Sequence, residues 1–141
     1  MIRLPILAAA AIAAAATAFA GMTPAPEGAR VYFIGLEDGD TVQSPVTIRF
    51  GLDGMGVAPA GTDKEKTGHH HLLIDEELEG AELDEPIPSD DNHLHFGGGQ
   101  TEATLDLPPG EHTLQLVLGD WSHIPHDPPV MSERITITVE E

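Results

Sequence analysis

The chain has 141 residues, contains no cysteine and carries a formal net charge of −18 at pH 7. The lack of cysteine excludes disulfides, thiolate metal sites and cysteine nucleophiles. The strong negative charge argues against binding to nucleic acid or to anionic lipid head groups. It favours cations or cationic partners, or a saline habitat in which a hydrated acidic surface keeps the protein soluble.

The N-terminal segment has the pattern of a secretory signal peptide. A basic start at Arg3 precedes an alanine-rich apolar run over residues 4–16, and Ala18-Phe19-Ala20 fits the small-x-small cleavage pattern. The run is too short for a membrane span, and no later run is long and apolar enough to be one. We therefore expect a signal peptide over residues 1–20, cleaved after Ala20, and a periplasmic or secreted mature protein.

Short alternating segments with turn residues between them make up the rest of the chain. Residues 21–28 contain two prolines and no periodicity, which predicts a flexible lead, and residues 29–141 are long enough for one domain. Strands are expected, in chain order, within residues 29–36, 41–42, 45–52, 70–74, 101–107, 112–118 and 134–139. No convincing amphipathic helix pattern is present. The class is therefore all-β.

Alternation within these strands predicts which side chains form the core. The inward-facing residues are expected to be Val46, Ile48, Phe50, Leu52, Ala103, Leu105, Leu107, Leu114, Leu116, Leu118, Ile135, Ile137 and Val139. Two apolar faces of this kind pack most simply against each other. We expect an immunoglobulin-like antiparallel β-sandwich of about seven strands, with a small β-barrel as the alternative.

The histidines of this chain gather in a few places. His69 and His71 point to one face of a strand, about 6.6 Å apart along the backbone, and His93 and His95 form a second alternating pair. Neutral imidazole is the commonest protein ligand for transition metals. If the two faces meet, the four imidazoles converge on one metal ion. His123, His126 and Met131 follow in a proline-rich loop that could close over such a site.

Two other histidines are better explained as structural residues. His70 shares its strand face with Leu72 and Ile74, which predicts a packing role. His112 follows the turn Pro108-Pro109-Gly110, where immunoglobulin-like folds often place a side chain that bonds back to the preceding corner. Neither is expected to bind metal.

Five ordered motifs resemble a known bacterial family. They are DGDTVQSPVTIRFGL, GHHHLLID, HFGGGQTE, LPPGEHTLQLVLGD and HIPHDPPVMSERITITV, and they span nearly the whole mature chain from Val31 onward. The sequence is similar to the domain-of-unknown-function family 4399, a family of small exported domains. The resemblance implies a periplasmic or secreted β-domain built around the histidine motifs, and it supplies neither a reaction nor a ligand.

Three functions are compatible with these residues. The leading hypothesis is a periplasmic metal-binding domain, with copper first and zinc second, because copper(II) heads the affinity order for nitrogen ligands. The second is a non-enzymatic interaction module in which the histidines form a structural hydrogen-bonded cluster and an acidic surface binds a cationic or glycan partner. The third is a metal-dependent hydrolase or oxidase, ranked last because the sequence shows no recognisable catalytic base.

Overall fold

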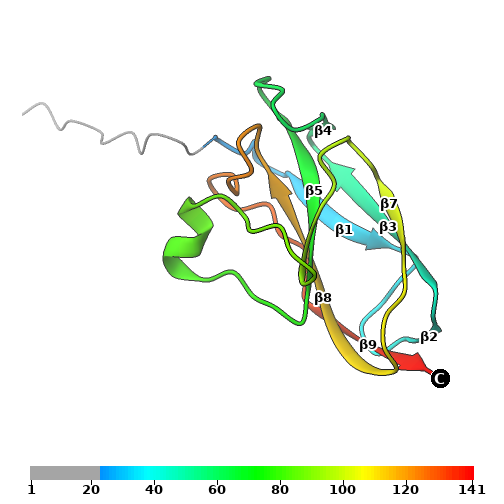
Figure 1. Cartoon of the computed structure of the whole chain (residues 1–141). Helices are drawn as coiled ribbons and strands as arrows, with labels where there is room; N and C mark the ends of the chain where they lie inside the picture. The colour runs from blue at the N-terminus through cyan, green and yellow to red at the C-terminus, as the bar shows by residue number, and fades with distance from the viewer. Residues whose placement is uncertain (1–22) are drawn as a thin grey trace, which may run out of the picture.

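The computed structural model describes residues 23–141, and it shows an all-β domain built from two sheets (Figure 1). The expected signal peptide lies outside the described residues. Within residues 23–141, no helix is long and apolar enough to cross a membrane. The all-β prediction is confirmed, and two facing sheets agree with a sandwich or a barrel.

The smaller sheet contains three antiparallel strands in the order β1-β3-β7. These are β1 (Arg30–Ile34), β3 (Val46–Asp53) and β7 (Glu102–Leu105). The central strand, β3, alternates buried and exposed residues from Val46 to Phe50. That alternation is the mark of a sheet with one face on the core and one in solvent.

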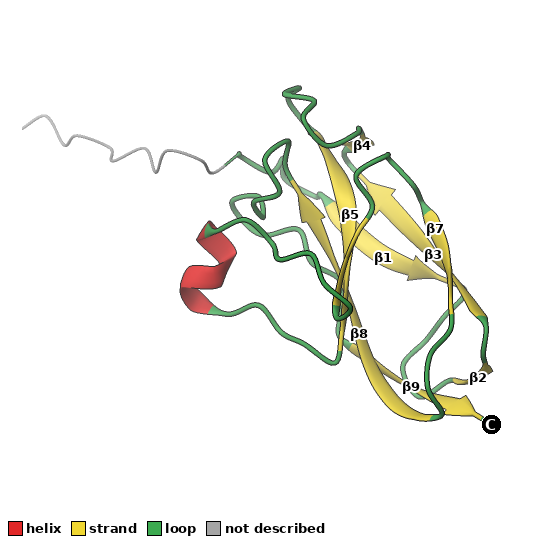
Figure 2. Ribbon diagram, in the orientation of Figure 1, coloured by secondary structure: helices red, strands yellow, loops and turns green. Residues whose placement is uncertain are grey.

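The larger sheet has the order β2-β9-β8-β5-β4 (Figure 2). β6 also pairs with β5. Its strands are β2 (Thr41–Gln43), β4 (Gly56–Val57), β5 (Thr67–Ile74), β6 (His93–His95), β8 (Gly110–Gly119) and β9 (Ile135–Glu140). β2 runs parallel to β9 and β4 runs parallel to β5, whereas the β5–β8, β8–β9 and β5–β6 pairs are antiparallel. β5 and β8 are thus the centre of this sheet.

The main core lies between the two sheets and contains the residues that alternation predicted. Ile48 and Phe50 from the smaller sheet pack with Leu72, Leu116 and other apolar residues from the larger sheet. His70 occupies the same face of β5 as Leu72, and its ring lies 5.2 Å from that of Phe50. The predicted packing role of His70 is confirmed.

The opposite face of the larger sheet carries a second, smaller apolar cluster. Leu73 of β5 and Val117 of β8 pack there against Leu78 and Ile87 from the acidic segment between β5 and β6. This segment contains the 3-10 helix η1 (Gly80–Asp84). His69 and His71 point to this same face of β5, so the outer face of the sheet holds both an apolar patch and the histidines.

Four loops meet at the end of the sheet where these histidines lie. The Ala60 amide donates to the Gly97 carbonyl at 2.8 Å, and the Gly61 amide donates to the Trp121 carbonyl at 2.9 Å. The Ile87 amide donates to the His123 carbonyl at 2.8 Å. The loop after β8 is therefore fastened to its neighbours from two sides.

Candidate metal centre

Strand β5 supplies the two innermost imidazoles of the site. His69 and His71 are separated by one residue, so both side chains leave the same face of the strand. They are 0% and 1% exposed, respectively. Their Nε2 atoms lie 3.0 Å apart. Strand geometry thus places this pair on one face, as the sequence predicted.

Strand β6 brings a third imidazole to the same place. It runs antiparallel to β5 with His95 directly opposite His71, so the two side chains share one face of the sheet. The His95 ring lies 5.0 Å from the ring of His71 and 5.0 Å from that of His69. His95 is more exposed than His69 and His71.

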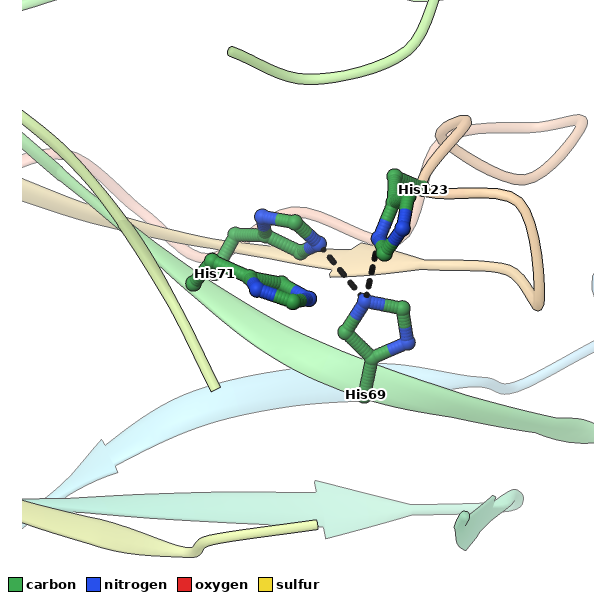
Figure 3. Close-up of side chains that lie close together, drawn as sticks. His69, His71 and His123 are labelled. Carbon is green, nitrogen blue, oxygen red and sulfur yellow. Dashed lines mark hydrogen bonds between the residues drawn. The ribbon is translucent and has the colours of Figure 1, made fainter. Parts of the chain in front are cut away.

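His123 completes the group from the loop that follows β8. Its backbone is left-handed, with φ of 69°, a conformation uncommon outside glycine. Its Nδ1 atom lies 3.1 Å from Nε2 of His69, and its ring lies 4.7 Å from that of His95. Figure 3 shows the rings of His69, His71 and His123 pointing toward one another.

Each of these four residues offers one ring nitrogen to a common point. These nitrogens all lie within 4.8 Å of one another. Four nitrogens held tetrahedrally at 2.0–2.1 Å from a zinc ion would be about 3.3–3.4 Å apart. The contacts of 3.0 and 3.1 Å are close to that spacing.

Two glycines leave the space that these rings fill. A Cβ atom on Gly119 would lie 2.6 Å from Nε2 of His71, and one on Gly97 would lie 2.6 Å from Nε2 of His95. Both distances are well inside van der Waals contact. Meanwhile Nδ1 of His69 and Nδ1 of His71 are buried with no hydrogen-bond partner among the described residues. Close packing therefore orients the rings. In many other metal sites, hydrogen bonds from surrounding residues do this.

The surroundings of His69, His71 and His95 favour the neutral form of these three imidazoles. Burial, reinforced by the neighbouring rings of His69, His95 and His123, lowers the pKa of His71 to about 2. Burial, followed by the proximity of His95 and His123, lowers the pKa of His69 to about 4. Burial and His123 also lower the pKa of His95. Near neutral pH each of these three rings therefore keeps a lone pair on one nitrogen, which is the state that binds metal.

Three residues predicted for the site have other neighbours in the structure. Nδ1 of His93 lies 2.8 Å from the Asp90 carboxylate. His126 is buried with its ring nitrogens 3.4 and 3.2 Å from the carbonyls of Leu118 and Thr67. Met131 forms an isolated antiparallel β-bridge with Val117 and packs against the smaller apolar cluster. The compact group consists of His69, His71, His95 and His123.

His112 plays the structural part that its position predicted. Its Nε2 atom lies 2.7 Å from the Pro108 carbonyl and its Nδ1 atom lies 2.8 Å from the Asp75 carboxylate. The hydrogen bond with Asp75 raises the pKa of His112. His112 thus bonds back to the corner that precedes its strand and links it to the end of β5.

One residue near the site was missed from the sequence. Asp120 is 1% exposed and lies in the loop that carries His123. An aspartate beside a glycine at a strand end usually signals an exposed turn, so nothing in the sequence marked it as buried.

Comparison with known proteins identifies a family whose description names no function. The model of the family described as Domain of unknown function (DUF4399) matches residues 48–140, which include all four histidines of the group. A search of curated proteins found no significant match. A search of solved structures found none either.

Proposed function

This chain belongs to the family described as Domain of unknown function (DUF4399), and on that premise we propose that it binds one transition-metal ion through His69, His71, His95 and His123. One observation carries the proposal: four ring nitrogens from two strands and a loop lie within 4.8 Å of one another. The bound ion would offset the crowding of their lone pairs.

The ligand chemistry favours copper, with zinc second. All four donors are imidazole nitrogens, and the chain offers no thiolate because it has no cysteine. Copper(II) binds nitrogen ligands more tightly than the other divalent first-row metals. We place His93, His126 and Met131 outside the proposed centre, since each is engaged elsewhere.

The role we propose is to hold or transfer the ion outside the cytoplasm. The support for export is the signal-peptide pattern of residues 1–20. Mass spectrometry of the protein from a periplasmic fraction is expected to give a chain that begins at Gly21. Intact protein beginning at Met1 in the cytoplasmic fraction would refute the location.

Metal titration tests the binding site. Copper(II) and zinc(II) are titrated into tag-free protein, into a variant with His71→Ala and His95→Ala, and into His112→Gln as a control. His112 lies outside the group, so its replacement removes an imidazole without touching the proposed centre. We expect one tight site in the unaltered protein and the control, and a large loss in the double variant. Equal binding by all three would mean that charge alone attracts the ions.

A structural histidine cluster is the second candidate. Its support is the pair of contacts of 3.0 and 3.1 Å, which are also hydrogen-bond distances. The two candidates differ in how the melting temperature responds to metal. An ion that binds only the folded protein raises this temperature in proportion to RT ln(1 + [L]/Kd), whereas a purely structural cluster gives no specific increase.

A further inference from the structure

The buried carboxylate of Asp120 organises the loop that carries His123. Its Oδ1 atom accepts hydrogen bonds from the Ser122 amide and hydroxyl, both at 2.9 Å, and from the Ile124 amide at 3.0 Å. The backbone closes the same turn, because the His123 amide donates to the Asp120 carbonyl at 3.0 Å. The carboxylate thus holds the residues on both sides of His123.

This arrangement stabilises an unfavourable backbone conformation. His123 has a positive φ, which is unfavourable for a residue other than glycine and persists only where the surroundings enforce it. The hydrogen bonds to Asp120 supply that enforcement. Without them, the loop would relax and Nδ1 of His123 would leave its place 3.1 Å from His69.

The other carboxylate oxygen of Asp120 reaches the start of the domain. Oδ2 accepts a hydrogen bond from the Thr23 hydroxyl at 2.7 Å, across 97 positions of sequence. The backbone of Thr23–Ala25 also lies along the loop: the Asp127 amide donates to the Thr23 carbonyl, and the Ala25 amide donates to the Asp127 carbonyl, both at 2.9 Å. This N-terminal strap begins three residues after the expected cleavage site.

We propose that Asp120 is a positioning residue that couples docking of the N-terminal strap Thr23–Ala25 to metal binding at the four-histidine centre. The coupling rests on the proposed function. The strap fixes the Asp120 carboxylate, the carboxylate fixes the loop, and the loop presents His123. Because such coupling is reciprocal, a bound ion must also strengthen docking of the strap.

The negative charge of Asp120 would also favour a bound cation at the four-histidine centre. Burial is the largest cause of the lowered pKa of His69, and the negative charge of Asp120 opposes it. A negative charge in this loop would partly compensate a bound cation. Outer residues of this kind commonly change metal affinity by about 10–100-fold when they are replaced.

The test removes one hydroxyl and then restores it. Thr23→Val deletes the donor to Asp120, Thr23→Ser keeps it, and Thr47→Val is the control, because the Thr47 hydroxyl pairs with Thr104 on the smaller sheet. Zinc(II) dissociation constants are measured by chelator competition on tag-free protein made from the full sequence. We expect binding about 10-fold weaker in Thr23→Val and unchanged binding in the other two.

Amide hydrogen exchange tests whether metal binding in turn strengthens docking of the strap. The amides of Ala25 and Asp127 should exchange more slowly in the zinc-loaded protein than in the metal-free protein, and this protection should vanish in Asp120→Asn. If Asp120→Asn fails to fold, the Thr23 variants still decide the question.

The possible outcomes separate the coupling from the site itself. Tight zinc binding that is equal in Thr23→Val and Thr47→Val, with no change in exchange at Ala25, would overturn the coupling and leave the centre intact. Loss in Thr23→Val without recovery in Thr23→Ser would also overturn it, since a general effect of substitution would then explain the loss. Absence of binding by the unaltered chain would overturn both proposals.

Discussion

Replacement of Gly119 by alanine should disable the metal centre without adding or removing a ligand. The backbone of Gly119 lies within strand β8 and not in the left-handed region, so alanine is conformationally allowed there. Its Cβ atom would, however, lie 2.6 Å from Nε2 and 2.9 Å from Cδ2 of His71. The His71 ring would have to move by about 0.8 Å to restore ordinary contact.

A shift of this size matters because binding sites tolerate about 0.5 Å of misplacement. His71 is enclosed on its other sides and 1% exposed, so the ring has little space to move without disturbing His69 or His95. We expect copper(II) and zinc(II) affinity to fall by about 10–100-fold. Stability of the metal-free protein should fall by about 1–3 kcal/mol, the usual cost of overpacking.

The assay compares Gly119→Ala with Gly56→Ala by chelator competition and urea unfolding. Gly56 lies in strand β4, on the other side of β5 from β8, and a Cβ atom there would lie 3.7 Å from Thr67 Cγ2 and 4.0 Å from the Lys66 carbonyl oxygen, which are ordinary contacts. The control should therefore bind metal like the unaltered protein. If Gly119→Ala binds as tightly as Gly56→Ala, the close packing of His71 does not define the site and the reasoning fails.

Three further predictions concern stability. Leu116→Ala should lower the free energy of unfolding in urea by about 2–5 kcal/mol, because Leu116 is fully buried in the main core; a loss of about 0.5 kcal/mol or less, as at a surface site, would place it outside that core. Burial lowers the pKa of His70 from 6.5 to about 4, so the unfolded chain binds more protons between these values. Stability of the metal-free protein should be fully present above pH 6.5 and should fall as the pH drops through this window, by roughly 3 kcal/mol from His70 alone; stability that is flat or rises toward pH 4 would contradict this. His70→Leu should raise stability at pH 7 by about 1–3 kcal/mol, since both ring nitrogens of His70 lack partners among the described residues, and a loss would reveal a polar contact for this ring.

Much of the fold follows from local sequence pattern. Alternation placed Ile48, Leu116 and Ile137 inside, and all three are buried. The same parity rule separated His70 from His69 and His71 across the two faces of β5. Short elements were less visible, because β4 has only two residues and η1 lies in a segment whose prolines and carboxylates indicate a loop.

The site was predictable only as far as strand geometry reaches. Alternation pairs His69 with His71, but the partner of His71 on β6 depends on register, which placed His95 opposite it and His93 opposite Leu73. The choice between His123 and His126 depends on how the loop after β8 folds. A buried carboxylate, Asp120, and a strap from the far end of the sequence determine that fold, and no local pattern encodes such a contact.

X-ray absorption at the metal edge of copper-loaded or zinc-loaded protein tests the central claim most directly. The account predicts three or four nitrogen ligands with the multiple-scattering signature of imidazole, at about 2.0–2.1 Å for zinc. A first shell made of oxygen atoms, with at most one imidazole, would contradict it. In that case the ion would be bound by the acidic surface, and the convergence of His69, His71, His95 and His123 would be structural.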